Sequence, residues 1–277
     1  MSLIFKEDTH SYISKEDEAQ IEWTSVTSLV SIFKPAFDVT GISEKVSKNK
    51  RSKWYGIPPE TIRKIWEAES NRALELGTFY HNQREADICS LASIEKEGTL
   101  LPVYSPIQKD GVKHAPDQKI SNGVYPEHLV YLKSAGVCGQ ADLVEVVNNT
   151  VYITDYKTNK EIKMEGFTNW EGITTKMAAP VNHLDHCDYN HYALQFSIYM
   201  YIILKHNPKL KPGKLFIHHV TFEKESEDEF GYPIYKKLPN GDPIVEKVTP
   251  IEVPYLRDEV IDIINWLKDN PNQNKKK

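Results

Sequence analysis

The sequence contains few cysteines and no long apolar segment. Cys89, Cys138 and Cys187 are far apart among 277 residues, and their odd number fits reduced intracellular thiols better than a disulfide-bonded scaffold. No segment approaches the ~20 consecutive apolar residues of a membrane-spanning helix, and residues 1–6 lack the apolar core of a signal peptide. We therefore expect an intracellular, cytoplasmic protein that does not bind membranes.

An excess of positive charge is also absent. The formal net charge is −5, so composition alone does not predict a nucleic-acid-binding protein. Hydrophobic residues make up 40% of the chain, an ordinary share for a globular protein, and we find neither an internal repeat nor a convincing linker. The length permits one large domain or two small ones, and the order of the predicted elements favours a single domain over residues 1–277. The oligomeric state is left open.

Positive charge is concentrated in one segment, residues 45–64. It contains seven lysines and arginines, its first acidic residue is Glu60, and aromatic rings lie among or beside the cations. A groove for single-stranded DNA combines cations that bind phosphates with flat rings that stack on bases. The candidate DNA-binding residues are Lys48, Lys50, Arg51, Lys53, Trp54 and Tyr55. A solvated helix and loop would explain the same composition without a partner.

Apolar periodicity divides the chain into regular elements. A short hairpin over residues 4–23 precedes a helical N-terminal part over residues 24–92, and a core over residues 120–268 follows. The predicted helices are residues 26–33, 60–91, 189–205 and 256–268, and the predicted strands are residues 124–132, 137–147, 151–157 and 214–222. This order of elements predicts an α/β fold.

Capping and breaking residues mark the ends of the N-terminal helices. Thr24 or Ser25 caps the first helix, and Pro35 stops it. The second helix has a possible break at Gly77 and Thr78, because glycine weakens a helix interior.

Other segments lack such periodicity. Residues 97–123, 159–188 and 223–250 are rich in turn-forming or polar residues, and we expect them to form loops. We expect residues 270–277 to be a disordered tail.

The segment from Gln140 to Lys157 is the most informative. Asn148 and Asn149 lie between β-branched runs and predict a two-residue hairpin turn, because asparagine tolerates the positive φ of a type I′ turn. Val147 then pairs with Thr150, and the same register places Asp142 opposite Asp155. Lys157 lies on the same face, two residues further on.

A second turn extends this arrangement. If the chain turns at Ser134 and Ala135, Glu127 on the preceding strand lies opposite Asp142, although Gly136 could shift the register. Adjacent carboxylates repel in a partly dry site unless a cation lies between them, and oxygen ligands favour Mg²⁺ or Mn²⁺. Such a site, with one or two ions, would activate a water that a neighbouring lysine orients or deprotonates. A surface hairpin with an ordinary aspartate–lysine ion pair is the alternative.

Four motifs resemble those of the PD-(D/E)XK nuclease superfamily, in the RecB-like branch that includes phage and mitochondrial DNA exonucleases. They occur in the family's order between residues 73 and 201, and the sequence around Trp23 also resembles the start of phage-type members. The motifs are Gly77-Thr78-Phe79-Tyr80-His81, Tyr125-Pro126-Glu127, the pair Gly139-x-x-Asp142 and Asp155-Tyr156-Lys157, and Gln195-x-x-x-Tyr199. The resemblance implies a restriction-endonuclease-like core, a central mixed β-sheet flanked by helices.

The resemblance also implies roles for single residues. Asp142, Asp155, the Tyr156 carbonyl and His81 would hold the metal, and Lys157 would position the attacking water. Glu127 sits where this branch carries an acidic residue on the first core strand. On the residues alone, His81 could instead be a helix histidine paired with Glu85.

Gln195 and Tyr199 are one helical turn apart, so both side chains can reach the same site. The resemblance implies that they contact substrate phosphate or support Lys157. Without the other motifs, they would be an ordinary glutamine and a core tyrosine.

Two positions depart from the family pattern. Ala141 stands in place of the proline after which the family is named, which affects only the backbone. Asp155 stands in place of the more frequent glutamate, which shortens the ligand by one methylene group. The cysteines that bind an iron–sulfur cluster in some relatives are absent, so no cluster is expected.

A second group of metal-binding residue types contains His183, His186, Cys187 and His191. Its spacing matches no familiar zinc pattern, and adjacent residues such as His186 and Cys187 diverge on regular backbone. We therefore expect no zinc site there.

These observations predict a Mg²⁺- or Mn²⁺-dependent deoxyribonuclease. We expect an exonuclease acting on single-stranded DNA or duplex ends in recombination, repair or replication, and a phage-encoded protein in the host cytoplasm fits the resemblance. A structure- or sequence-specific endonuclease and a catalytically silent nucleic-acid-binding protein of the same fold are the alternatives. The residues alone do not separate DNA from RNA, and they do not reveal the polarity of cleavage.

Overall fold

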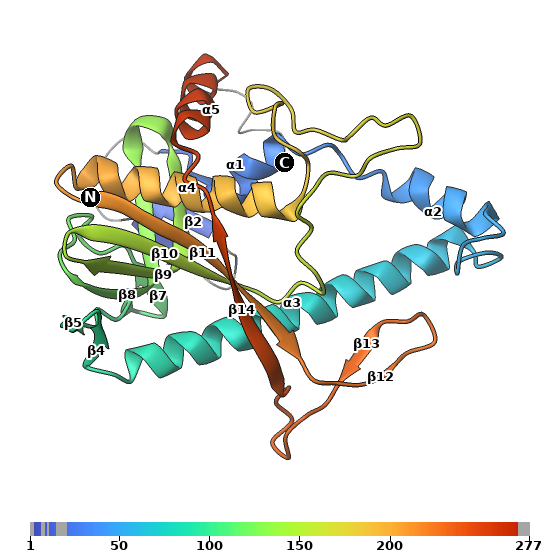
Figure 1. Cartoon of the computed structure of the whole chain (residues 1–277), viewed down its shortest axis with the longest axis horizontal. Coiled ribbons are helices and arrows are strands. Elements are labelled where there is room, and N and C mark those ends of the chain that lie inside the picture. Colours follow the sequence, from blue (N-terminus) through green and yellow to red (C-terminus); the bar gives the residue numbers. More distant parts are fainter. Residues whose placement is uncertain (1–2, 7–8, 10, 15–20, 271–277) are drawn as a thin grey trace.

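The computed structural model describes residues 3–6, 9, 11–14 and 21–270, so the tail from residue 271 and part of the expected N-terminal hairpin lie outside it. Five α-helices occur among these residues (Figure 1). They are α1 (Val26–Ile32), α2 (Val39–Lys48), α3 (Pro59–Cys89), α4 (Asp188–His206) and α5 (Arg257–Asp269). No helix of the described chain is long and apolar enough to cross a membrane.

A six-stranded mixed sheet forms the centre of the molecule. Its order is β14-β11-β10-β9-β3, and β8 also pairs with β9. Its strands are β3 (Thr24–Ser25), β8 (Gly123–Leu132), β9 (Val137–Val147), β10 (Thr150–Lys157), β11 (Lys211–Phe222) and β14 (Val245–Val253). The β10–β11 and β3–β9 pairs are parallel, whereas the other pairs are antiparallel. The predicted α/β fold is therefore confirmed.

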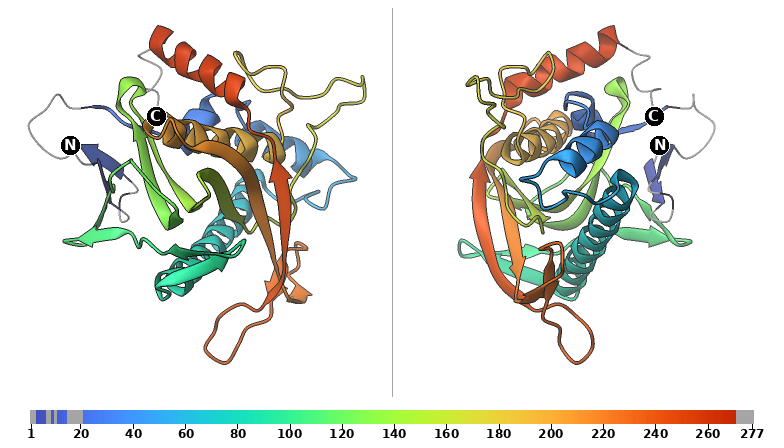
Figure 2. Two further views of the ribbon diagram at one scale, coloured as in Figure 1. Left: turned by 60° about the vertical axis from the view of Figure 1, so that its left-hand side comes forward. Right: turned by 90° about the vertical axis from the view of Figure 1, so that its right-hand side faces the viewer.

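The sheet is covered on both faces. Val144, Ile153 and Ile217 point into the main core, which α1, α4 and α5 complete. Leu143 and Tyr152 alternate with these residues and pack on the other side, towards α3. Figures 1 and 2 show α4 and α3 on opposite sides of the sheet.

The predicted register of the core hairpins is confirmed as far as the strands pair. Thr150 pairs with Val147, and the ladder continues to Thr154 opposite Leu143. Asn148 and Asn149 both have positive φ, 49° and 63°, as a type I′ turn requires. The turn before β9 also keeps the expected register, because Gly136 closes it with a φ of 62° and adds no residue to the ladder.

Two regions expected to be loops contain strands, so these predictions were wrong. Residues 97–123 contain β5 (Thr99–Pro102), which pairs with β4 (Ser93–Lys96), as well as β6 (Ile107–Lys109) and β7 (Val112–His114). The strands β7 and β6 extend a small sheet that begins with β2 (Ser11–Ser14) and β1 (Leu3–Lys6). These strands are only three or four residues long, and every residue of β6 is exposed, so they lack the alternating apolar pattern of a half-buried strand.

The region before Pro250 contains β12 (Lys224–Glu227), β13 (Pro233–Tyr235) and most of β14. The polar residues of β14 form an exposed edge of the central sheet, and partners distant in sequence supply its hydrogen bonds. By contrast, residues 159–187 contain no named helix or strand, as expected.

Helix α3 runs unbroken through Gly77 and Thr78, so the predicted break was wrong. An isolated glycine costs a helix only about 1 kcal/mol relative to alanine. Packing against the sheet opposes this cost, since the Tyr80 ring contacts Tyr156 of β10 edge to face at 5.5 Å. The unbroken helix lies beneath the core strands in Figure 1, and its His81 reaches the Tyr156 carbonyl of β10.

Candidate metal centre

Three potential metal ligands from three elements converge at one point. His81 of α3, Glu127 of β8 and Asp142 of β9 each offer one ligand atom, and these atoms lie within 4.8 Å of one another. Among the described residues, no other group of three histidine, cysteine or acidic side chains brings its ligand atoms this close together. Two carboxylates and one imidazole form a donor set suited to a divalent cation such as Mn²⁺ or Mg²⁺.

Asp142 and His81 also contact the backbone of β10. The Tyr156 amide donates a hydrogen bond of 2.8 Å to Asp142 Oδ2, which lies 3.2 Å from His81 Nδ1. The other ring nitrogen, His81 Nε2, lies 2.9 Å from the Tyr156 carbonyl oxygen. Three of the metal ligands predicted from the sequence, His81, Asp142 and the Tyr156 carbonyl, therefore lie together. Glu85 pairs with Lys113 and not with His81.

Burial and the charge of Asp142 shift the pKa of His81 in opposite directions. Burial by itself would lower the pKa of His81, but the Asp142 carboxylate and its hydrogen bond raise that pKa to about 9. The imidazole is therefore protonated at neutral pH when only protein groups surround it, so a metal ion would have to displace this proton.

Asp155 and Lys157 lie beside this group but pair with each other. The β9–β10 ladder ends at Leu143 opposite Thr154, one residue before Asp142 and Asp155. Lys157 donates a hydrogen bond to Asp155, which is 1% exposed.

The charge of Asp142 shifts the pKa of both Asp155 and Lys157. Burial and the charge of Asp142 raise the pKa of Asp155 to about 6. Burial disfavours the charged form of Lys157, but Asp155 and Asp142 outweigh burial and raise the pKa of Lys157 above its ordinary value. Lys157 Nζ also lies 4.9 Å from the centre of the Tyr192 ring of α4.

An irregular backbone turns Glu127 into the site. Its φ is 49°, which is unusual for a residue with a side chain, and it leaves the ladder between Pro126 and His128, which both pair with β9. Gln140 donates a hydrogen bond to Glu127 Oε2. Burial and the charge of Asp142 raise the pKa of Glu127 to about 8.

Sequence reasoning missed one side chain next to this centre. Lys113 of β7 is buried, and its Nζ lies 3.1 Å from Glu85 Oε2 and 3.9 Å from Glu127 Oε2. It belongs to a segment expected to be a loop, and no local pattern indicates that this segment lies against β8.

Gln195 and Tyr199 lie on the face of α4 that packs against β9. Gln195 Nε2 donates a hydrogen bond of 3.1 Å to Tyr199 Oη. The buried Tyr199 ring lies against Gly139, where an added Cβ would be 2.7 Å from the ring. Burial and the charge of Asp155 raise the pKa of Tyr199 well above its ordinary value. The pair therefore lies beneath the Asp155 side of the site.

The basic segment lies around the C-terminal end of α2 and the turn that follows it. Lys48 is in the last turn of α2, Lys50 and Arg51 are exposed, and 53% of Tyr55 is exposed. Trp54 differs from the others, because only 6% of it is exposed. Its ring stacks on Phe230 at 5.5 Å and meets Trp66 edge-on at 6.0 Å, so it serves internal packing.

Lys53 reaches the hairpin formed by β12 and β13. Its Nζ lies 4.8 Å from the Trp54 ring and 4.7 Å from the Tyr232 ring. It also donates a hydrogen bond to the Phe230 carbonyl, so this lysine joins the basic segment to the hairpin.

The second group of metal-binding residue types does not converge. His186 Nδ1 lies 2.9 Å from His191 Nε2, but His183 lies 3.1 Å from Glu259. The Cys187 thiol donates to the Met164 carbonyl.

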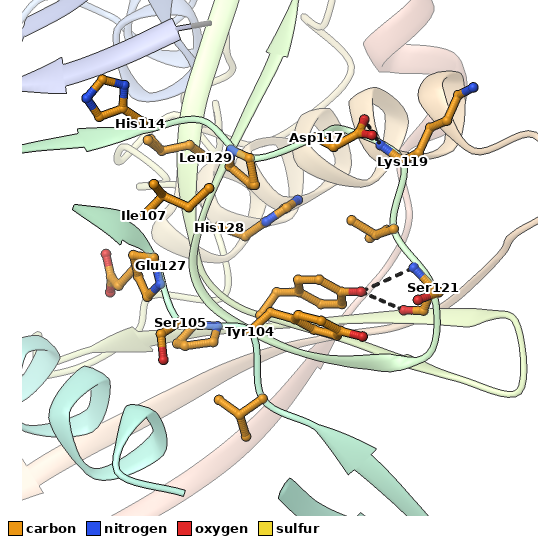
Figure 3. A pocket seen from close by; sticks show the side chains of 16 residues that line it. Tyr104, Ser105, Ile107, His114, Asp117, Lys119, Ser121, Glu127, His128 and Leu129 are labelled. Atoms are coloured by element: carbon orange, nitrogen blue, oxygen red, sulfur yellow. Dashed lines mark hydrogen bonds between the residues drawn. The ribbon is translucent and has the colours of Figure 1, made fainter. Parts of the chain in front are cut away.

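A cavity of about 460 Å³ opens along β8, with Glu127 in its wall (Figure 3). Tyr104 and Tyr125 stack at 4.8 Å in this wall, and Tyr125 Oη donates a hydrogen bond to the Ser121 carbonyl. Figure 3 also shows His128 and Lys119 among the polar lining residues. Its size and mixed lining are typical of a small-molecule site.

Comparisons with known proteins provide no family assignment. No family model and no curated protein matches the chain. Among solved structures, the chain has a weak likeness to one titled "Crystal structure of SSO0001", with 13% identity, a TM-score of 0.32, and coverage of 94% of this chain and 81% of that one. A likeness of this size carries no argument about fold family or function.

Proposed function

We propose that this protein is a Mg²⁺- or Mn²⁺-dependent deoxyribonuclease of the PD-(D/E)XK type, in the RecB-like branch. The observation that carries this proposal is the convergence of His81, Glu127 and Asp142 beside the buried Asp155–Lys157 pair. A protein without a catalytic role has no evident need for carboxylates that repel each other in a buried site. The order of the four sequence motifs supports the same assignment.

His81, Glu127 and Asp142 would hold the cation, with the Tyr156 carbonyl and Asp155 next to them. When bound, the cation would polarise the scissile phosphate and lower the pKa of a coordinated water. The Tyr156 amide keeps Asp142 in place, and the bend at Glu127 brings in the third side chain.

Lys157 would position the attacking water and stabilise negative charge on the phosphoryl group. The carboxylates around it raise its pKa, so it acts as a fixed cation in their presence and not as a proton acceptor. Asp155 and the Tyr192 ring hold its ammonium group. Gln195 and Tyr199 would support this arrangement from α4.

DNA would approach along the basic segment. Lys48, Lys50 and Arg51 would bind phosphates, and the exposed Tyr55 would stack on a base, whereas Lys53 is held by the hairpin. The preference for ends or single strands comes from the family resemblance alone.

The test is digestion of end-labelled linear DNA and of covalently closed circular single-stranded DNA, with Mg²⁺, Mn²⁺ or a chelator. We expect metal-dependent cleavage of linear DNA. Cleavage of closed circles would favour the endonuclease alternative, and DNA binding without any cleavage would favour the silent binding protein. An RNA substrate of matched sequence tests the choice of nucleic acid.

The first variant to test is Lys157→Ala. We expect it to reduce the cleavage rate by about 10²-fold or more, because it removes the group that orients water, while DNA affinity stays within a few-fold. Lys176→Ala is the matched control, since Lys176 pairs with Asp185 in the loop before α4. Full activity of Lys157→Ala would remove this lysine from the mechanism.

A further inference from the structure

The cavity along β8 shares Glu127 with the proposed metal centre. Glu127 lines the cavity, and one of its carboxylate oxygens lies within 4.8 Å of the His81 and Asp142 ligand atoms. A group bound in the cavity would therefore lie beside the cation. The cavity volume of about 460 Å³ falls within the range of about 300–1,000 Å³ that is typical of small-molecule sites. This size suits a group as large as a nucleoside, and not a length of duplex DNA.

Two stacked tyrosines give the cavity a flat aromatic wall (Figure 3). The Tyr104 and Tyr125 rings are 4.8 Å apart and within 14° of parallel. Ser121 fixes the hydroxyl of Tyr125, because its amide donates to Tyr125 Oη at 3.1 Å and its carbonyl accepts at 2.8 Å. Tyr104 lies over Gly123, where an added Cβ would be 2.5 Å from the ring. Tyr104 is nevertheless 46% exposed, so part of this flat wall remains free to stack on a ligand.

His128 is a buried polar group without a hydrogen-bond partner. Only 4% of it is exposed, and no hydrogen bond joins its ring nitrogens to another described residue. These nitrogens are not sealed by protein, since the fully covered and unpartnered side-chain atoms of the described chain belong to Arg72 and Arg84. The ring therefore presents its nitrogens to the cavity that it lines (Figure 3). Buried polar groups in native proteins are nearly always hydrogen-bonded, so this imidazole indicates a polar ligand in the cavity.

The lining favours an uncharged flat group over a phosphate. Aromatic rings stack on any base, because every base has a flat face, and imidazole nitrogens can donate to or accept from the edge of a base. Among the residues that line the cavity there is no arginine and one lysine, Lys119, and the lining also contains Asp117 and Glu127. A phosphate would therefore stay at the metal centre, and the attached nucleoside would enter the cavity.

We propose that this cavity binds the nucleoside next to the scissile phosphate, with its base against the Tyr104–Tyr125 wall and hydrogen-bonded to His128. This inference rests on the proposed nuclease function, and it names the part of the substrate that the cavity holds. Tyr104 and His128 are substrate-binding residues, since they contact the nucleoside away from the reacting atoms.

The first experiment measures nucleoside binding to the full chain in the presence of a chelator, so that no cleavage takes place. The probes are 2′-deoxyadenosine, thymidine and, as the base-free control, 2-deoxyribose, each followed by saturation-transfer NMR. We expect both nucleosides to bind and 2-deoxyribose not to bind. Tyr104→Leu removes a half-exposed ring and should weaken nucleoside binding by roughly ten-fold or more, whereas Tyr104→Phe keeps the ring and should keep the affinity.

His128→Phe separates hydrogen bonding from packing. It keeps a flat ring and removes both nitrogens, so we expect a several-fold loss of nucleoside affinity. If this buried variant does not fold, the two Tyr104 variants decide the matter. Nucleosides that do not bind the wild type, or that bind Tyr104→Leu as tightly as the wild type, would overturn the proposal.

The second experiment places the cavity relative to the cleaved bond. The substrates are end-labelled oligonucleotides in which a tetrahydrofuran residue, which lacks a base, replaces the nucleotide on one side or the other of the cleaved bond. We expect the missing base to raise KM by roughly ten-fold on one side in the wild type. It should have little further effect in Tyr104→Leu, because both changes remove the same contact. Equal effects of the missing base in the two proteins would show that the base binds elsewhere.

The two proposals fail in different ways. Nucleoside binding that depends on Tyr104, in a chain that leaves DNA intact, would refute the nuclease and keep the nucleoside site. Cleavage of DNA at a rate that does not depend on the missing base would keep the nuclease and refute the role of the cavity.

Discussion

At the scale of single residues, burial and charge act against each other throughout the metal centre. Asp142 is buried, yet the charges of His81 and Lys157 and the Tyr156 amide hold its pKa below the ordinary value. The pKa of the neighbouring Asp155 is raised, because burial and the charge of Asp142 both disfavour its ionised form. The two carboxylates titrate as a pair, and Asp142 keeps the lower pKa because it accepts hydrogen bonds from the Tyr156 amide and from His81.

The imidazole of His81 should set the choice of metal. Nitrogen ligands favour transition ions over Mg²⁺, so we expect the wild type to bind Mn²⁺ more tightly than Mg²⁺. His81→Ala should weaken Mn²⁺ binding by roughly ten-fold or more and Mg²⁺ binding by less. Titration with each ion measures both affinities. His114→Ala is the control, and an unchanged ratio of the two affinities would rule out His81 as a ligand.

At the scale of elements, two glycines near the site differ in how closely their neighbours pack against them. Gly77 lies in the middle of α3, where an added Cβ would meet only Thr158 Oγ1 at 3.4 Å. Gly139 of β9 lies under Tyr199, where an added Cβ would be 2.7 Å from the ring and 3.1 Å from Val26. The first glycine tolerates a side chain and the second does not.

Alanine at these two positions should therefore change stability in opposite directions. We expect Gly77→Ala to raise the free energy of unfolding by up to about 1 kcal/mol, because alanine favours the helix. Gly139→Ala should lower it by about 1–3 kcal/mol, because Tyr199 must move. Denaturant titration of both variants measures the changes. A stable Gly139→Ala protein would show that α4 can shift without cost.

The loop from Thr158 to Cys187 joins the lysine of the site to α4 and exposes apolar side chains. Trp170 is 92% exposed and Phe167 is 75% exposed. The loop is nevertheless ordered by its own hydrogen bonds, since Asn169 Oδ1 accepts from the Glu171 and Ile173 amides. This loop therefore holds two aromatic rings in solvent on an ordered backbone.

If the protein binds DNA, Trp170 should stack on bases. We expect Trp170→Ala in a Lys157→Ala background to weaken binding of single-stranded DNA by roughly ten-fold, as for other stacking residues. Fluorescence anisotropy measures this change. Leu100→Ala, at a position of β5 that is 69% exposed, is the control. Equal effects of the two substitutions would exclude a specific role for Trp170.

At the scale of the whole molecule, stability and metal binding should depend on pH in opposite ways. Asp142 raises the pKa of His81 from 6.5 to about 9 despite burial. The interaction of protonated His81 with Asp142 therefore stabilises the metal-free protein fully below pH 6.5, and this stabilisation is lost as pH rises through 9. Burial raises the pKa of Glu127, which acts in the same direction. Metal binding has the opposite dependence, because the ion competes with these protons.

The increase in melting temperature caused by Mn²⁺ should therefore be larger at pH 9 than at pH 6.5. Thermal unfolding at several pH values, with Mn²⁺ and with a chelator, measures this difference. His81→Ala should remove much of the pH dependence. An Mn²⁺-induced increase in melting temperature that becomes smaller as pH rises would contradict the protonation of His81 in the metal-free site.

Much of the centre could be predicted from local patterns. Asn148 and Asn149 determined the hairpin, and strand alternation then placed Asp142 near Asp155 and Lys157. Helical spacing placed Gln195 beside Tyr199. Backbone preferences and side-chain periodicity depend on neighbouring residues, so they can be read from a sequence.

Contacts between distant segments could not be predicted in this way. Only the tertiary structure placed Lys113 against Glu85 and Glu127, because β7 meets α3 and β8 through packing. Packing also covered Trp54 with Phe230, and it kept α3 continuous through Gly77. The sequence by itself determined the strands and the turn that carry Asp142, Asp155 and Lys157. The fold decided which further charges surround them, since burial and long-range contacts depend on the whole chain.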